Sequence, residues 1–292
     1  GRPARAGRVP AVSRTDVRKT YKLYIGGAFP RSESGRTYLV NDASGNLLAN
    51  ASQASRKDAR DAVKAARSAF GGWSSRTAYN RGQVVYRIAE VLESRRAQFE
   101  AEIVAAVGAK PAEARTEVDA AIDRLVWYAG WTDKIAQVDG AANPVAGPYF
   151  NLSTPEPTGM VAVLAPESPL LGLVSVVAPL IAVGNTCVVI ASQPAPLLAI
   201  TFAEVLATSD VPGGVVNILT GDAAEIGPWL ASHMDVNGLD LTGVTDADLA
   251  RDLEIAAADN LKRVRRRGVE DLAATPELDR MTRFLEIKTV WH

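Results

Sequence analysis

VAVLAPESPLLGLVSVVAPLIAVGNTCVVI, residues Val161–Ile190, is the stretch that decides the fold. It begins and ends with short apolar runs rich in β-branched residues, Val161–Leu164 and Thr186–Ile190, which are typical of buried strands. Between them, Leu170–Val183 is apolar on every side, as a buried helix is, and Gly184 and Asn185 mark the turn that follows. A strand, a helix and a strand in this order predict a parallel sheet.

The same alternation continues toward the C-terminus, and helices precede it. The later elements are expected as a helix at Leu197–Thr208, a strand at Val215–Leu219, a helix at Ala223–Ser232, a strand at Leu239–Leu241 and a helix at Asp246–Val264. Earlier helices are expected from a capping box of Ser55 and Asp58 to Gly71, at Arg81–Val107 and at Glu113–Ile135. The sequence therefore predicts an α/β fold with a doubly wound, Rossmann-like parallel sheet and N-terminal helices.

Two segments do not follow this alternation of strands and helices. Residues Tyr149–Ser153 lie between prolines and read as one strand of a small exposed ribbon. Phe284–Trp291 alternates like a strand but has no neighbouring strand in the sequence. We therefore expect this tail to add to the edge of another chain's sheet, and its removal to leave the α/β core intact.

Composition excludes several classes of protein. The 32 Lys and Arg nearly balance the 33 Asp and Glu, so no whole-protein basic field is available for nucleic acid. Cys187 is the single cysteine and there are two histidines, which excludes an internal disulfide and a Cys/His zinc cluster. No metal site is predicted.

The charge pattern raises two questions about location. Thirty-six residues without a charge follow Glu167, but Pro179 and Pro194, among other breaks, divide them into pieces too short to cross a bilayer. No membrane partner is therefore predicted, and a cytoplasmic location is expected. Residues 1–21 form a basic arm, which reads as a solvated segment, a docking arm for a partner or a degenerate transit peptide.

Six segments, taken in order, resemble the N-terminal portion of the aldehyde dehydrogenase family. They are LYIGG at Leu23–Gly27, AVKAARSAFGGW at Ala62–Trp73, EPTGMVAVLAP at Glu156–Pro166, APLIAVGNT at Ala178–Thr186, VPGGVVNILTG at Val211–Gly221 and LTGVT at Leu241–Thr245. The tail FLEIKTVWH at Phe284–His292 is similar to the family's C-terminal strand. The resemblance implies a truncated member of the family.

The catalytic part of the family is missing between these segments. After NLKRV, Asn260–Val264, the family continues into an LELGG segment that carries a general-base Glu, whereas this chain continues as RRRGVEDL. The nucleophilic Cys of the family lies in the same missing domain, and Cys187 is on an expected buried strand, where a cysteine is a small apolar side chain. We therefore predict no catalytic residue, and no aldehyde oxidation by this chain alone.

The resemblance also implies a degenerate NAD groove. Ser168 stands at or near the family's oxyanion Asn, and Ala191 and Gln193 replace its ribose-binding Lys and Glu. Beside Gly243, Val244 replaces a Ser of the phosphate-binding turn. The acidic residues that follow it, Asp246 and Asp248, are expected to cap the N-terminus of the next helix. No tight cofactor binding is predicted; a shifted, weaker mode of NAD binding through Gln193 and Thr242 is the alternative.

The implied domain organisation has four parts. They are a basic arm at 1–21, a nucleotide-binding-type domain at 22–139 and 156–267, an oligomerisation ribbon and strand at 140–155 and 284–292, and a linker at 268–283 in place of the catalytic domain. In the family the ribbon and the C-terminal strand build the oligomer, and the expected assembly residues are Tyr149, Phe150, Leu152, Ile287, Val290 and Trp291.

Three functions follow from this resemblance. The first is a non-catalytic subunit that assembles with a full-length, active NAD-dependent aldehyde dehydrogenase, or with itself. The second is an NAD(P)-binding regulatory module. The third is an oxidoreductase whose active site is completed by a partner chain.

Overall fold

The computed structural model describes residues 17–268 and 270–292. Its centre is a parallel five-stranded sheet in the order β10-β9-β6-β7-β8. The strands are β6 (Met160–Leu164), β7 (Thr186–Ile190), β8 (Val216–Leu219), β9 (Gly238–Asp240) and β10 (Arg263–Arg265). This confirms the α/β fold with a Rossmann-like sheet.

Helices cover both faces of the sheet, as its continuous apolar strands require. On one face lie α1 (Arg56–Ser74), α8 (Ala223–Ser232) and α9 (Ala247–Ala258). On the other lie α6 (Leu171–Ala182) and α7 (Pro196–Ala207), backed by α2 (Ala78–Ser94) and α4 (Pro111–Trp131). Every residue of α6 is buried because α4 and the sheet enclose it. The predicted capping box of α1 is confirmed, since Ser55 and Asp58 bond each other's backbone.

The expected single helix at 81–107 is two helices, which is a correction. Helix α2 ends at Ser94 and α3 (Arg96–Val107) begins after Arg95, which has φ −108° and ψ 11°. The guanidinium of Arg95 donates to Glu204 of α7 at 2.7 Å. The break lets α3 turn onto α4 and α7, whereas a straight helix would leave them. The third expected helix, at Glu113–Ile135, corresponds to α4, which ends earlier, at Trp131; Ile135 begins the short α5 (Ile135–Asp139).

The predicted helix at Asp246–Val264 extends too far. Helix α9 ends at Ala258, and Leu261 adopts a left-handed conformation with φ 57° that turns the chain back. The chain then forms β10, whose register with β9 runs from Arg263 opposite Gly238. The periodicity of the helix hides this strand, because a three-residue edge strand carries almost no pattern of its own.

Near the N-terminus a separate three-stranded sheet has the order β1-β3-β2. Its strands are β1 (Thr20–Tyr21), β2 (Thr37–Asn41) and β3 (Leu47–Ser52). The expected strand at Leu23–Ile25 forms only isolated bridges, including Tyr24 with Ile218 of β8. Of the basic arm, residues 1–16 lie outside the described residues.

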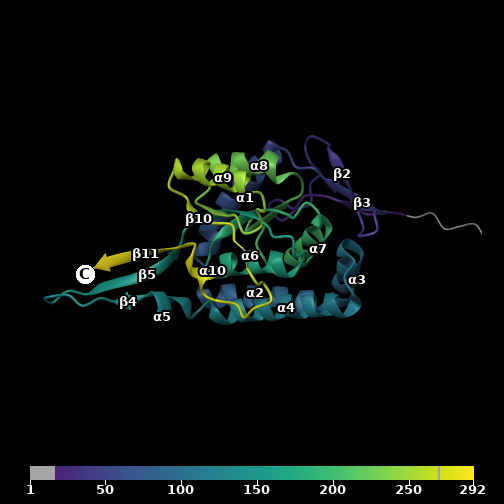
Figure 1. Cartoon of the computed structure of the whole chain (residues 1–292). Coiled ribbons are helices and arrows are strands. Elements are labelled where there is room, and N and C mark those ends of the chain that lie inside the picture. The colour runs from purple at the N-terminus through teal and green to yellow at the C-terminus, as the bar shows by residue number, and fades with distance from the viewer. Residues whose placement is uncertain (1–16, 269) are drawn as a thin grey trace, which may run out of the picture.

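A third sheet projects from the body of the molecule as a ribbon in the order β11-β5-β4 (Figure 1). It contains β4 (Ala141–Ala142), β5 (Asn151–Pro157) and β11 (Leu285–Trp291), which follows the short α10 (Asp279–Thr282). Strands β11 and β5 pair antiparallel over their whole length. The expectation that the tail lacks a partner in its own chain is therefore wrong, because the fold returns it to β5.

The tail also contributes to the core, which is a second correction. Phe284 is 1% exposed and Leu285 is 6% exposed, and both belong to the main apolar cluster. The carbonyl of Phe284 accepts hydrogen bonds from Asn185 and from the backbone of Thr158. The α/β domain therefore depends on the first residues of the tail. Within the described ranges, no helix is both long enough and apolar enough to cross a membrane.

Candidate functional site: a closed sheet edge and an open ribbon edge

The carboxyl ends of β6, β7 and β9 surround a hollow of about 240 Å³. Ligands of doubly wound sheets bind at this edge. Ala191, Gln193, Gly243 and Val244 all line the hollow, so four of the five predicted groove positions lie together. Ser168 does not line it; the neighbouring Glu167 does.

Gly243 fixes the shape of this hollow. A Cβ at Gly243 would lie 2.1 Å from the carbonyl oxygen of Ala165, so only glycine allows the turn after β9 to approach the end of β6. The N–H of Gly243 donates to the carbonyl of Leu164 at 2.9 Å.

The N-terminus of α9 at the hollow is occupied by a side chain of the chain itself. Asp246 caps the helix, accepting from the N–H groups of Asp248 at 2.8 Å and Leu249 at 3.3 Å. The capping role predicted for Asp246 is confirmed. These are N–H groups on which a helix N-terminus would otherwise hold a phosphate.

The N-terminus of α6 is closed in the same way. One Glu117 oxygen accepts from the N–H groups of Leu170 at 3.0 Å and Leu171 at 3.2 Å, and from the Ser168 hydroxyl at 3.2 Å. Ser168 in turn accepts from the N–H of Gly172 at 3.1 Å. Ser168 therefore shapes the start of α6.

These contacts do not suit the pyrophosphate of a dinucleotide. Both helix N-termini already bind carboxylates of the chain, and Asp246 adds negative charge beside the hollow. Thr242, the partner named for a shifted mode of binding, does not line the hollow with Gln193. Its hydroxyl donates to Asp240 and accepts from Arg280 at 3.4 Å. Of the two residues of the alternative mode, only Gln193 therefore lines the hollow.

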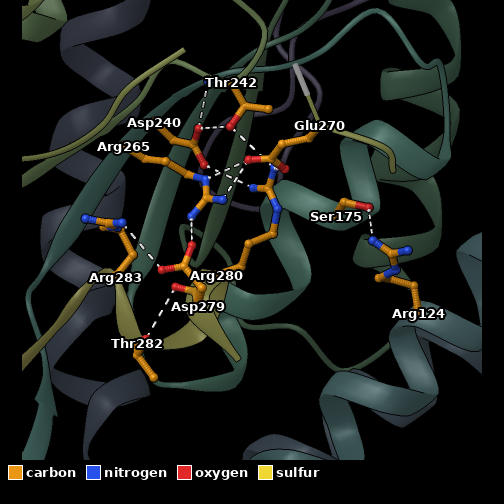
Figure 2. Close-up of polar contacts among 10 residues, drawn as sticks. All are labelled: Arg124, Ser175, Asp240, Thr242, Arg265, Glu270, Asp279, Arg280, Thr282 and Arg283. Atoms are coloured by element: carbon orange, nitrogen blue, oxygen red, sulfur yellow. Dashed lines mark hydrogen bonds and ion pairs between the residues drawn. The ribbon is translucent and has the colours of Figure 1, made fainter. Parts of the chain in front are cut away.

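A cluster of ion pairs lies beside Thr242, where the sequence predicted only a linker (Figure 2). Arg265 of β10 binds Glu270 at 2.6 Å and also binds Asp279. Arg280 of α10 binds Glu270 and lies 3.5 Å from Asp240 of β9. Residues 265–268 and 270–280 are thus folded against the sheet. The run of three arginines followed by two acids in RRRGVED was the available signal, but sequence alone does not show which acids face which guanidinium groups.

The charges of this cluster set the protonation of its acids. Burial alone would raise the pKa of Glu270, but hydrogen bonds and charges from Arg265 and Arg280 outweigh it and lower the pKa overall. The pKa of Asp279 is lowered by the same balance, with Arg265 the main partner. Both carboxyl groups are therefore ionised at neutral pH and hold the segment in place.

Cys187 is fully buried on β7, where it was expected. Burial raises the pKa of its thiol to about 12, so the thiol is neutral and cannot act as a nucleophile in the folded chain. No group of three or more His, Cys, Asp or Glu side chains that could hold a metal ion occurs in the part of the chain that the structure describes.

The predicted assembly residues lie on the ribbon. Tyr149 and Phe150 are exposed and precede β5, which begins at Asn151, although the backbone of Phe150 pairs with that of His292. Val290 lies opposite Leu152 in the register. The most exposed apolar side chains of the ribbon are those of Tyr149, Phe150, Ile287 and Trp291, each more than half exposed.

The outer edge of β11 has no strand beside it among the residues that the structure describes. The reciprocal bonds between His292 and Phe150 place the even-numbered residues, such as Lys288 and Val290, in the hydrogen-bonded pairs with β5. The N–H groups of Ile287 and Thr289 therefore point away from β5, toward the open edge.

Comparisons with known proteins agree with this geometry. The aldehyde dehydrogenase family model matches residues 29–266. The chain is 34% identical over 263 residues to cytosolic 10-formyltetrahydrofolate dehydrogenase of Mus musculus, covering 87% of this chain and 29% of that protein. It is 34% identical over 249 residues to aldehyde dehydrogenase, cytosolic 1 of Elephantulus edwardii, covering 83% of this chain and 49% of that protein.

A solved structure gives the same assignment. The NAD+ complex of aldehyde dehydrogenase from Bacillus cereus superposes with a TM-score of 0.80 at 28% identity, over 84% of this chain and 50% of that chain. The chain thus spans half or less of the length of these relatives. The sheet order, the ribbon and the matched residues 29–266 lead to one conclusion: the chain belongs to the aldehyde dehydrogenase family.

Proposed function

We propose that the chain is a non-catalytic aldehyde dehydrogenase-family subunit that assembles with an active, NAD-dependent aldehyde dehydrogenase. The observation that carries this proposal is the open edge of β11, on a ribbon whose Ile287 and Trp291 side chains are more than half exposed. Open edges with apolar neighbours favour the addition of a strand from another chain.

The lack of catalysis is supported by the course of the chain after β10. Residues 265–268 and 270–280 run through the ion-pair cluster to α10 and then to β11, whereas the family resemblance leads one to expect the LELGG segment after β10. The neutral, buried thiol of Cys187 offers no substitute nucleophile.

Weak binding of NAD is part of the proposal. The capping of α9 by Asp246 and of α6 by Glu117 supports it, as do Ala191 and Gln193 in the hollow. An NAD-binding regulatory module is the second candidate, and a saturable NAD site measured by calorimetry would favour it.

Completion of an active site by a partner chain is the third candidate. Against it stands the packing of Leu272 at the start of α6: a Cβ on Gly172 would lie 3.5 Å from Leu272. The carbonyl groups of Leu272 and Ala274 are held by Arg124 of α4. A partner's domain would have to displace this segment to reach α6. A cytoplasmic location is proposed with the assembly, supported by relatives whose names include cytosolic forms.

The test is co-expression of this chain with a full-length aldehyde dehydrogenase of the same source, followed by native mass spectrometry. Thr289→Pro removes an N–H at the open edge, and Thr289→Ala is its matched control, since both lose the 2.8 Å hydroxyl contact with Ser153. Proline cannot donate a ladder hydrogen bond, and each ~1.4 kcal/mol of binding free energy lost lowers the affinity about tenfold. We expect Thr289→Pro to release the partner and Thr289→Ala to retain it.

A complex that survives Thr289→Pro would overturn assembly through this edge. A chain that associates only with itself would overturn the hetero-oligomer. Aldehyde oxidation by the purified chain would overturn its non-catalytic character, and in each case its family membership would stand.

A further inference from the structure

A second hollow, also of about 240 Å³, lies between α4 and residues 270–280. The segment that closes the α/β domain forms one wall, and Arg124 and Tyr128 of α4 form the other. This volume lies below the ~300–1,000 Å³ that is usual for pockets of drug-sized ligands, so it suits a small ligand.

The Tyr128 hydroxyl is the group in this hollow that most needs a ligand. The side chain is 0% exposed, and its hydroxyl has no hydrogen-bond partner within the described chain. Buried hydroxyl groups without a partner are costly and rare. Burial raises the pKa of Tyr128 to about 12, against the opposing effect of Arg280, Arg124 and Arg265. The hydroxyl is therefore a neutral donor beside three guanidinium groups.

Arg124 adds a buried positive charge to the same wall. Its side chain donates to the Ser175 hydroxyl at 3.1 Å and to the carbonyls of Leu272 and Ala274 at 2.7 and 2.8 Å (Figure 2 shows the contact with Ser175). All three acceptors are neutral, and no carboxylate of the described residues lies within 4 Å of the guanidinium. In contrast, Arg265 and Arg280 are neutralised by acids.

The opposite wall carries acids of its own. Asp271 and Glu277 line the hollow, and neither forms an ion pair among the described residues. Three charged groups of the hollow form no ion pair among the described residues: the Arg124 guanidinium on α4, which Asp271 attracts at longer range, and the exposed carboxylates of Asp271 and Glu277 on the facing segment. This arrangement complements a molecule that is itself dipolar.

We propose that this hollow binds a small amino-acid-type ligand. Its carboxylate would meet Arg124 and the Tyr128 hydroxyl, and its ammonium group would face Asp271 and Glu277. Such a ligand bridges α4 and the 270–280 segment, and so ties that segment more firmly to the domain. The proposal is independent of the assembly proposed above.

The test is calorimetric titration of the full chain with glycine, β-alanine and γ-aminobutyrate, which vary the separation of the two charges. Propionate and ethylammonium are the single-charge references. We expect at least one dipolar probe to bind saturably at millimolar concentration, about tenfold or more tightly than either reference. No saturable binding, or equal binding of the references, would overturn the proposal.

Tyr128→Phe separates a ligand contact from a structural role. The hydroxyl has no partner among the described residues, so its removal should leave the melting temperature unchanged or raise it, while binding weakens about tenfold. Tyr38→Phe is the matched control, because the Tyr38 hydroxyl is also buried without a partner but lies on β2, outside this hollow. Equal probe affinity in Tyr128→Phe and Tyr38→Phe would overturn the assignment.

Discussion

Arg280 and Asp240 form a buried ion pair, with Nη1 of Arg280 3.5 Å from Oδ2 of Asp240 and side chains that are 8% and 3% exposed. Asp240 ends β9 and Arg280 lies in α10, within the segment that stands where the family's catalytic domain would follow. The pair therefore joins the central sheet to the segment that the sequence predicts only as a linker.

Replacing Arg280 by Gln should destabilise the whole domain. Asp240 and Glu270 would both lose a cation, and loss of one partner of a buried pair costs about 3–5 kcal/mol. Arg283→Gln is the control: Arg283 is 48% exposed and bonds Asp279 at 3.4 Å, so its loss should cost about 1 kcal/mol or less. Urea unfolding of both variants measures the difference, and equal midpoints would contradict it.

Glu270→Gln should change how stability depends on pH. The folded-state pKa of Glu270 lies below its ordinary value of 4.5, so its contribution is fully present above that value and is lost as the pH falls through the folded pKa. The variant should be less stable than the parent near pH 7, and the gap should shrink below about pH 4. Denaturant melts across this range test it; a constant gap would point to packing alone.

The Cys187 thiol should be inert in the native protein. It is 0% exposed with a pKa near 12, so Ellman's reagent should react only after denaturation. Cys187→Ser should place a hydroxyl in an apolar core at a cost of about 1–3 kcal/mol and leave assembly unchanged. Rapid labelling of the folded chain, or loss of assembly in the variant at a temperature where it is folded, would contradict this.

Two truncations should behave differently. Deleting 286–292 removes the edge strand but keeps Phe284 and Leu285 in the core, so thermal unfolding should change little while the partner is lost. Deleting 284–292 also removes the Phe284 side chain, and the cavity should cost about 3–5 kcal/mol. Circular dichroism melts and native mass spectrometry of both forms distinguish these effects. Similar melting temperatures would show that Phe284 contributes little.

Local pattern predicts the sheet core well. The apolar strands β6 and β7 and the buried helix α6 are marked by composition and by Gly184, and the capping box of α1 by Ser55 and Asp58. Elements whose boundaries depend on contacts with residues far away in the sequence carry no such local signal. The break at Arg95 follows a contact with Glu204, and β10 exists because β9 offers an edge.

The hollow at the carboxyl ends of β6, β7 and β9 shows the same difference between local and distant determinants. The resemblance places Ala191, Gln193, Gly243 and Val244 at one edge, and the structure brings them together. The carboxylate that caps α6 belongs to Glu117, which is 53 residues from Leu170, and no local pattern connects the two. The same holds for the pairing of Arg280 with Asp240.

The pairing of β11 with β5 bears on the order of folding. Leu285 lies opposite Pro157, which is 128 positions earlier in the sequence. The pairing therefore closes a long loop that contains the whole five-stranded sheet. Loop-closure entropy opposes such a contact until the intervening chain has collapsed and brought the two strands near each other. The edge that we propose for assembly would then exist only on chains that have already folded. Only folded subunits would then enter the oligomer, because an unfolded chain would not have the edge that binds the partner.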